Sequence, residues 1–344
     1  MEAMLTRSKV KLPPLKEPRP FDLALLRAAD QPTPAELAAL RAPPIWWAVA
    51  DAPLTEMPTR LALAERLQAI GVCSAEQRAK VMAEVDLPAE LLESPLSKAE
   101  ADAGPRGRAV LRRALERQQT PLARTQVIDK ALTLAATNNV YAMEARFYAP
   151  AIETIEPNVE LGWFAPAAAR ALIVAGRFES ARGWLRVVEA PRDDATRAVA
   201  DRLFVLARLA AGEAIEPWRG ERLDAWIART KDKPEEAARL GRVLALMSAV
   251  GEPVDGRVWR DLVADGYRRP VAMPGPALLP ALAEAADKGR IGEGLALAAL
   301  ALGETRLADL PPPVLAPVVA ALDRLGFIDD ARALAVEAAI AAGL

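Results

Sequence analysis

Apolar residues recur along this chain at intervals of three and four, the spacing of one face of an α-helix. The pattern is clearest near the C-terminus, where the apolar positions are Val314, Leu315, Val318, Val319, Leu322 and Leu325. A second face follows at Ala331, Leu334, Ala335, Ala338 and Ala342. Three prolines, 311 to 313, precede the first of these helices, where proline is tolerated. The pattern predicts an all-α protein.

Turn residues separate these helices at a regular interval. They are Asn139, Gly176, Gly212, Gly251, Gly289 and Gly326, and their separations are 37, 36, 39, 38 and 37 residues. The stronger copies place a bulky apolar residue at +2 and usually a small residue at +5, as at Phe178 and Ala181. Glycine and asparagine tolerate the left-handed conformation that ends a helix. The interval therefore predicts stacked helical hairpins, with the +2 residue packed under the turn and the +5 residue where two helices approach closely.

This order of turn, bulky apolar residue and alanine resembles the tetratricopeptide (TPR) family, whose hairpins run Gly-x-Tyr-x-x-Ala-x-x-x-Phe-x-x-Ala. The match covers about residues 120–344 and is good after Gly176 and Gly326. The period averages near 37 rather than about 34 residues, and the Trp-x-x-Leu-Gly front half of the family motif is not visible. The resemblance implies a TPR-like α-solenoid of antiparallel hairpins whose first helices line a concave binding surface. An irregular all-α domain is the alternative.

Upstream of the repeat, prolines break the helical pattern into short pieces. Residues 21–103 are predicted to form an N-terminal helical region, joined near 101–107 to a solenoid at 104–344. Residues 1–20 combine five basic residues with four prolines and are predicted to be a flexible basic arm. The apolar stretch of a signal peptide does not follow them, and no charge-free run reaches the length of a membrane span. We expect a soluble protein, cytoplasmic rather than periplasmic unless a leader has been removed.

The composition removes several kinds of chemistry. The chain has 344 residues, no His and a single cysteine, Cys73. These counts exclude Ser-His-Asp and Cys-His catalysis, imidazole metal ligands, thiolate zinc cages and intramolecular disulfides. Cys73 is expected to be a buried small hydrophobic residue. A net charge of −2 gives no general attraction to nucleic acid or anionic lipid.

Paired carboxylates are the next candidates for chemistry. Asp193-Asp194 and Asp329-Asp330 are adjacent pairs, and adjacent residues on a helix point about 100° apart. Neither pair is followed by the further acids, three or four residues on, that Mg²⁺ chelation needs. Capping of a helix N-terminus explains both pairs better. No glycine-rich segment has the surroundings of a phosphate loop, so we predict no cofactor and no metal site.

Two surfaces are candidates for partner binding. Counting back from the turns by the TPR convention places on the concave side Gln126, Asp129, Thr133, Trp163, Arg170 and Arg202. The two arginines of this set favour a protein or peptide partner with an acidic segment. The alternative surface is a basic helix face formed by Arg106, Arg113 and Arg117. The arginine-rich run 106–124 has no interleaved aromatic residues for base stacking, so a solvated face explains it better than nucleic-acid binding does.

These observations favour a non-catalytic scaffold or adaptor that binds another protein, with no nucleic-acid partner and no membrane insertion. An all-α enzyme that uses carboxylate and arginine chemistry is a second hypothesis, and it requires acids clustered in a pocket. A regulator of nucleic-acid machinery that uses the 106–124 face is the third. The partner and the oligomeric state stay open.

Overall fold

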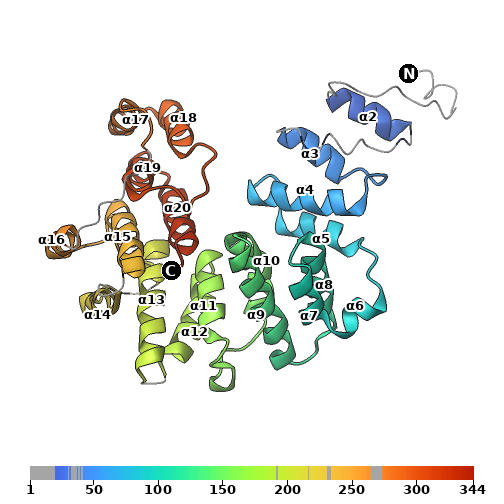
Figure 1. The fold of residues 1–344 in the computed structure, drawn as a ribbon, viewed down its shortest axis with the longest axis horizontal. Coiled ribbons are helices and arrows are strands. Elements are labelled where there is room, and N and C mark those ends of the chain that lie inside the picture. The colour runs from blue at the N-terminus through green and yellow to red at the C-terminus, as the bar shows by residue number, and fades with distance from the viewer. Residues whose placement is uncertain are drawn as a thin grey trace. The chain divides into compact units, whose positions relative to one another are not determined.

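The structure is a computed structural model that describes residues 20–29, 31, 37, 39, 42–190, 193–215, 217–230, 234–264 and 273–344. These residues form α-helices and two short 3-10 helices, with no strand among them, so the all-α prediction is confirmed (Figure 1). The predicted arm lies outside the described residues except for Pro20, where the first labelled helix begins. The chain divides into two compact units, one ending at Phe147 and the other beginning at Tyr148. The predicted joint at 101–107 lies within the first unit.

Proline marks the start of many helices in the first unit. Its helices are α2 (Pro20–Ala28), α3 (Pro43–Ala50), α4 (Met57–Ala69), α5 (Ala75–Ala83), α6 (Ala89–Glu93), α7 (Pro95–Ala101), α8 (Pro105–Arg117), α9 (Pro121–Thr137) and α10 (Tyr141–Glu153), which continues past Phe147. Proline occupies one of the first two positions of α3, α4, α7, α8 and α9. A backbone N–H is not required there, so the prolines that interrupt the apolar pattern begin new helices.

Two apolar clusters hold the first unit together. The first joins α2, α3 and α4 through residues that include Leu23, Val49 and Leu67, and it also contains Cys73. The second joins α4, α5 and α8 around Leu61, and Phe147 packs against it. Cys73 is buried, as the sequence predicts, and burial raises the pKa of its thiol. A raised pKa disfavours the thiolate, so this cysteine is a packing residue rather than a nucleophile.

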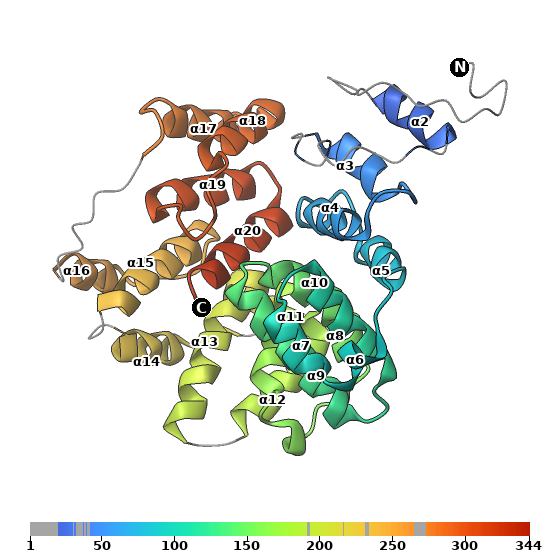
Figure 2. The same cartoon turned by 45° about the vertical axis from the view of Figure 1, so that its right-hand side comes forward.

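The second unit contains the helices that follow the later turns. They are η2 (Val159–Leu161), α11 (Ala165–Val174), α12 (Phe178–Glu189), α13 (Asp194–Ala211), η3 (Gly212–Ala214), α14 (Gly220–Thr230), α15 (Pro234–Ala249), α16 (Gly256–Ala264), α17 (Leu278–Asp287), α18 (Ile291–Leu302), α19 (Pro312–Arg324) and α20 (Ile328–Ala341). Consecutive helices pack as pairs, among them α11 with α12, α17 with α18 and α19 with α20 (Figure 2). No helix in the described part of the chain combines the length and the apolar character needed to cross a bilayer.

All six predicted turn residues have a positive φ. The angles are 57° at Asn139, 72° at Gly176, 55° at Gly212, 80° at Gly251, 64° at Gly289 and 90° at Gly326. At five of these turns the next backbone N–H donates to the carbonyl five residues earlier, for example Arg177 N to Leu172 O at 2.8 Å. This bond belongs to the Schellman motif that ends helices. Gly212 is the exception, because it begins the 3-10 helix η3.

The small residue at +5 has the predicted role. Ala181 and Ala331 are fully buried. A Cβ atom on Gly294 would lie 2.6 Å from Cδ1 of Leu325, so α18 and α19 approach each other closely at this position. Any larger side chain here must displace Leu325.

The prediction for the bulky residue at +2 is correct only in part. Tyr141 is buried and Phe178 is half-buried. Ile291 and Ile328 are 50% and 52% exposed, so the prediction is wrong for the last two hairpins. Since both residues stand in the first turn of a second helix, α18 and α20 present apolar surface there.

The last hairpin departs from the order of the chain. α19 packs against α15, and α20 packs against α13 and α15. The preceding hairpin, α17 with α18, packs on α19 (Figure 2). A strictly sequential stack would place each hairpin beside its neighbours in the sequence, whereas here α19–α20 also reaches the earlier helices α13 and α15.

Candidate functional site

The first half of the predicted partner-binding set lies on α9, in the first unit. Gln126 and Thr133 are exposed and Asp129 is half-buried, and their spacing places all three on one face of the helix. Burial raises the pKa of Asp129, and the charge of Lys130 opposes the rise. Lys130 itself pairs with Glu100 at 2.8 Å. The face is therefore polar, with one carboxylate that is partly withdrawn from water.

The second half of the set lies in the second unit. Trp163 is 48% exposed immediately before α11, and its ring centroid lies 5.7 Å from that of Phe164. Phe164 is fully buried and meets Trp184, also buried, edge to face at 5.6 Å. The buried Phe164 therefore contacts the ring of Trp163 on the side of the core, and the rest of the Trp163 side chain is exposed to solvent. Val159, four residues earlier, is 78% exposed.

Two arginines complete this half of the set. Arg170, seven residues after Trp163, lies on α11 and is half-buried. Arg202 is exposed on α13, which packs against α11, and has no ion-pair partner in the part of the chain that the structure describes. We call Val159, Trp163 and Arg170 the Trp163 face. It combines exposed apolar surface with positive charge.

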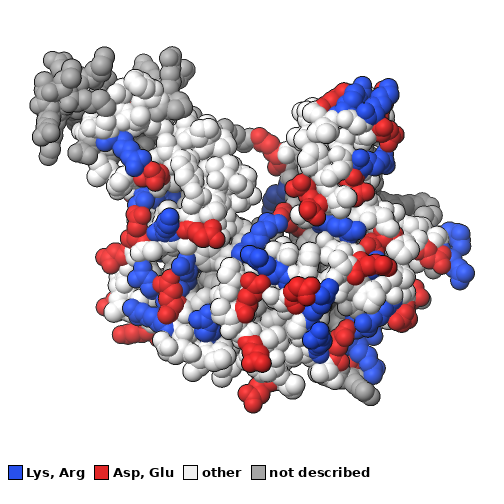
Figure 3. Space-filling model, turned by 180° about the vertical axis from the view of Figure 1, so that it is seen from behind, with Lys and Arg blue, Asp and Glu red and all other residues white. Residues whose placement is uncertain are grey.

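Two of the three arginines of the alternative basic face on α8 are exposed and outside ion pairs with described residues, and the third is engaged. Arg106 and Arg117 are exposed, and neither forms an ion pair with another described residue. Arg113 is engaged, because its Nη2 donates to Ala83 O at 2.9 Å and its Nε lies 3.5 Å from Glu116. In the view of Figure 3, positive and negative side chains are interspersed rather than gathered into one basic patch. On the face in view, these mixed charges do not form the basic stripe that is typical of nucleic-acid surfaces.

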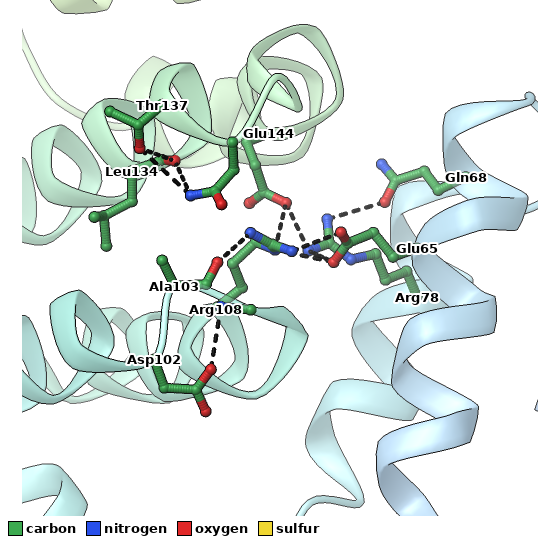
Figure 4. Close-up of polar contacts among 11 residues, drawn as sticks. Glu65, Gln68, Arg78, Asp102, Ala103, Arg108, Leu134, Thr137 and Glu144 are labelled. Carbon is green, nitrogen blue, oxygen red and sulfur yellow. Dashed lines mark hydrogen bonds and ion pairs between the residues drawn. The ribbon is translucent and has the colours of Figure 1, made fainter.

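A compact group of four charges lies inside the first unit. Glu65 on α4, Arg78 on α5, Arg108 on α8 and Glu144 on α10 point toward one another (Figure 4). Arg78 Nη2 is 2.6 Å from Glu144 Oε1, and Arg108 binds Glu65 through two nitrogens, at 2.6 and 2.9 Å. The four side chains are between 0% and 14% exposed. Two guanidinium and two carboxylate groups thus neutralise each other in the interior.

Other polar contacts hold the two arginines of this cluster in place. Arg78 donates to Gln68 Oε1 at 3.1 Å, and its guanidinium lies 4.9 Å from the centroid of the Phe147 ring. Arg108 donates to the carbonyl of Ala103 at 2.7 Å. These contacts orient both guanidinium groups toward the carboxylates.

Burial dominates the electrostatics of Glu144. Loss of hydration raises the pKa of this carboxyl group, and the charges of Arg78 and Arg108 oppose the rise. None of its side chain is exposed, so no substrate reaches it. The cluster therefore fixes the relative positions of α4, α5, α8 and α10 rather than performing chemistry.

This cluster was not predicted from the sequence, although the repeat contains a signal for it. Glu144 occupies position +5 after Asn139, where the other strong copies have Ala181, Gly294 and Ala331. A position that is buried in these stronger copies cannot hold a carboxylate without a charged partner. The partner side chains come from α5 and α8, outside the repeat, and only the tertiary structure identifies them.

A second buried ion pair lies in the second unit. Arg208 on α13 donates from Nε to Glu252 Oε2 at 2.8 Å, and both side chains are 4% exposed. Arg332 on α20 donates to the carbonyls of Arg208 and Leu209 at 3.0 and 3.2 Å. Its Nη2 also lies 3.8 Å from Glu252. These contacts join α20 to α13 and to the segment that follows α15.

The carboxylate pairs behave as capping groups or first-turn acids. Asp193 is the N-cap of α13 and accepts from Thr196 N at 2.9 Å, which lowers the pKa of its carboxyl group. Asp329 and Asp330 lie in the first turn of α20, but the N-cap is Phe327, so neither is the predicted cap. Among the described residues, no three His, Cys, Asp or Glu side chains come together in a geometry suited to a metal ion.

Comparison of the chain with protein-family models, curated proteins and solved structures finds no significant match. The TPR resemblance therefore rests on the turn residues and hairpins described above.

Proposed function

We propose that this protein is a non-catalytic interaction scaffold that binds a segment of a partner protein on the Trp163 face. The observation that supports the proposal is the state of Trp163 itself, half exposed and supported by Phe164. Exposed tryptophans held in a fixed orientation are typical anchors of protein interfaces. Pre-organisation lowers the entropy that such a side chain loses on binding.

The charges near this face favour an acidic partner segment. Arg170 lies on α11, the helix that follows Trp163, and Arg202 lies on α13, which packs against α11. A segment with one large apolar side chain and nearby carboxylates complements the two features. Charges of this kind contribute mainly to the association rate and to specificity.

The hairpins support a TPR-like solenoid as the underlying plan. Their turns have a positive φ and, at five of the six, the Schellman bond. The contacts of α19 and α20 with α13 and α15 modify this plan at the C-terminal end. The binding surface that we propose lies at α11, which α20 also contacts.

The test is affinity capture from the lysate and envelope fractions of the source organism. The full-length wild type is compared with Trp163→Ala/Arg202→Glu, and Arg186→Glu, an exposed change on α12, is the matched control. All three must show the same helical circular dichroism and melting temperature. A protein retained by wild type and by the control, but lost from the double variant, supports the proposal. Equal retention by all three rules out this surface as the binding site.

A further inference from the structure

A cavity of about 290 Å³ opens between α12, α13 and α14 of the second unit. None of its lining residues belongs to the Trp163 face. Six of them are charged, namely Glu189, Asp201, Glu221, Arg197, Arg222 and Arg229. Three carboxylates in one cavity meet the first requirement of the enzyme hypothesis, but three guanidinium groups accompany them. The positive and negative charges that line the cavity cancel.

Some of these charges are locked in place. Arg222 bridges two acids, with Nη2 at 2.5 Å from Glu189 and Nε at 4.0 Å from Asp201. Asp201 is 8% exposed and also pairs with Arg229. The guanidinium of Arg222 lies 5.7 Å from the centroid of the Phe204 ring. Glu189 and Asp201 are therefore neutralised by arginine, an arrangement suited to shaping a site rather than to proton transfer.

Other charges are available to a ligand. Glu221 is exposed and has no ion-pair partner among the described residues. Arg197 is 55% exposed and pairs at 3.1 Å with Asp194, which is 93% exposed. An ion pair this exposed contributes little stability, so Arg197 can exchange it for a ligand at small cost. Arg229 contacts Asp201 through Nη1 and is 38% exposed.

The size of the cavity and its charges together define a class of ligand. Pockets for drug-sized ligands and cofactors occupy about 300–1,000 Å³, so this cavity is suited to a smaller molecule. A ligand with one charge could contact either Glu221 or the two exposed arginines, Arg197 and Arg229, but not both kinds of group. A ligand that carries separated positive and negative groups satisfies both. Val188, Ala200 and Ala225 provide apolar surface between the charged groups.

We propose that this cavity binds a small zwitterion, an amino acid or a dipeptide. Its carboxylate contacts Arg197 and Arg229, and its ammonium group contacts Glu221. The cavity shares no residue with the Trp163 face, so failure of either proposal leaves the other standing.

Isothermal titration calorimetry on the full chain tests this proposal. The probes are the free amino acids and L-alanyl-L-alanine, with N-acetyl-L-alanine and L-alaninamide as analogues that carry a single charge. We expect at least one zwitterion to bind with a dissociation constant of about 1 mM or lower, and both analogues to bind about tenfold more weakly or not at all. The absence of saturable binding by any zwitterion up to about 10 mM, or equal binding by the analogues, overturns the proposal.

Matched variants locate the binding. Glu221→Gln and Arg197→Gln should each weaken zwitterion binding about tenfold, the effect of losing one charge-assisted hydrogen bond. Glu213→Gln and Arg186→Gln, exposed residues of the same unit that do not line the cavity, should bind like wild type. Unchanged melting temperatures show that all four variants are folded. Binding that is unaffected by the first pair of substitutions places the ligand elsewhere and refutes the assignment.

Discussion

Replacement of Arg78 by methionine tests the buried charge cluster of the first unit. The side chain of Arg78 is 2% exposed and lies 2.6 Å from Glu144, whereas Arg108 lies 3.9 Å from the same carboxylate. At an effective dielectric constant of about 20, unit charges 2.6 Å apart attract by about 6 kcal/mol. Part of that attraction offsets the dehydration of the two ions. Removing one partner of a buried pair costs about 3–5 kcal/mol.

Protonation of Glu144 limits this loss. In Arg78→Met the carboxyl group of Glu144 can take up a proton. Protonation costs about 1.4 kcal/mol for each unit by which the pH exceeds the ordinary pKa of 4.5. The limit is therefore about 3 kcal/mol at pH 7. In a unit of this size we expect the melting temperature to fall by about 2–4 °C per kcal/mol. Methionine retains a contact with the Phe147 ring, so the effect reports mainly the lost charge.

Arg112→Met is the matched control for this prediction. Arg112 also lies over Phe147, at 5.4 Å, but it is 29% exposed and pairs at 2.9 Å with the exposed Glu116. Its replacement should cost less than about 1 kcal/mol. The double variant Arg78→Met/Glu144→Leu removes both buried charges and should recover most of the lost stability.

The assay combines thermal unfolding with hydrogen exchange measured by mass spectrometry. Exchange is followed in peptides from α5, α8 and α10, because two units need not unfold together. Arg78→Met should lose protection in these peptides, and Arg112→Met should keep it. Equal losses of stability in the two variants would refute the reasoning, as would a double variant no more stable than Arg78→Met.

Three further predictions concern pH and packing. Burial raises the folded-state pKa of Glu144, and removal of the Arg78 charge raises it further. A carboxyl group with a raised folded-state pKa stabilises the fold at low pH and loses this contribution as the pH rises, so the loss of stability in Arg78→Met should be larger at pH 7 than at pH 5. An equal loss at the two pH values contradicts the role of Glu144. Gly107→Ala should destabilise the protein by about 2–3 kcal/mol, because the new Cβ atom would lie 1.7 Å from the carbonyl oxygen of Asp102. Gly241→Ala, whose Cβ atom would meet no atom within 4 Å, should stabilise it by about 0.5–1 kcal/mol. Thermal melts measure both changes. Arg332→Met should lower the free energy of unfolding by about 1–3 kcal/mol and weaken hydrogen-exchange protection at the end of α13, where Arg332 donates to the carbonyl of Arg208. Unchanged protection there would show that Arg332 does not hold α20 against α13.

The sequence determined the local structure of this protein to a large extent. Position-by-position apolar spacing predicted the last two helices, and glycine and asparagine marked six turns, all of which have a positive φ. The reason is that helix periodicity and left-handed turn residues are properties of neighbouring residues in the chain. The burial of the alanines at +5 followed from the same short-range pattern, and that of Cys73 from its residue type.

The arrangement of the hairpins and the pairing of the buried charges follow from contacts between helices that are distant in the sequence. Glu65 and Arg108 are 43 residues apart, and Arg208 and Glu252 are 44 residues apart. Nothing in the local pattern distinguishes these buried arginines from exposed ones such as Arg106. The same holds for the candidate sites, since Trp163 and Arg170 were predicted from the repeat but the cavity at Asp201 was not. Burial of a charge depends on partners brought from distant helices, and the free energy that selects them arises only when the chain is folded.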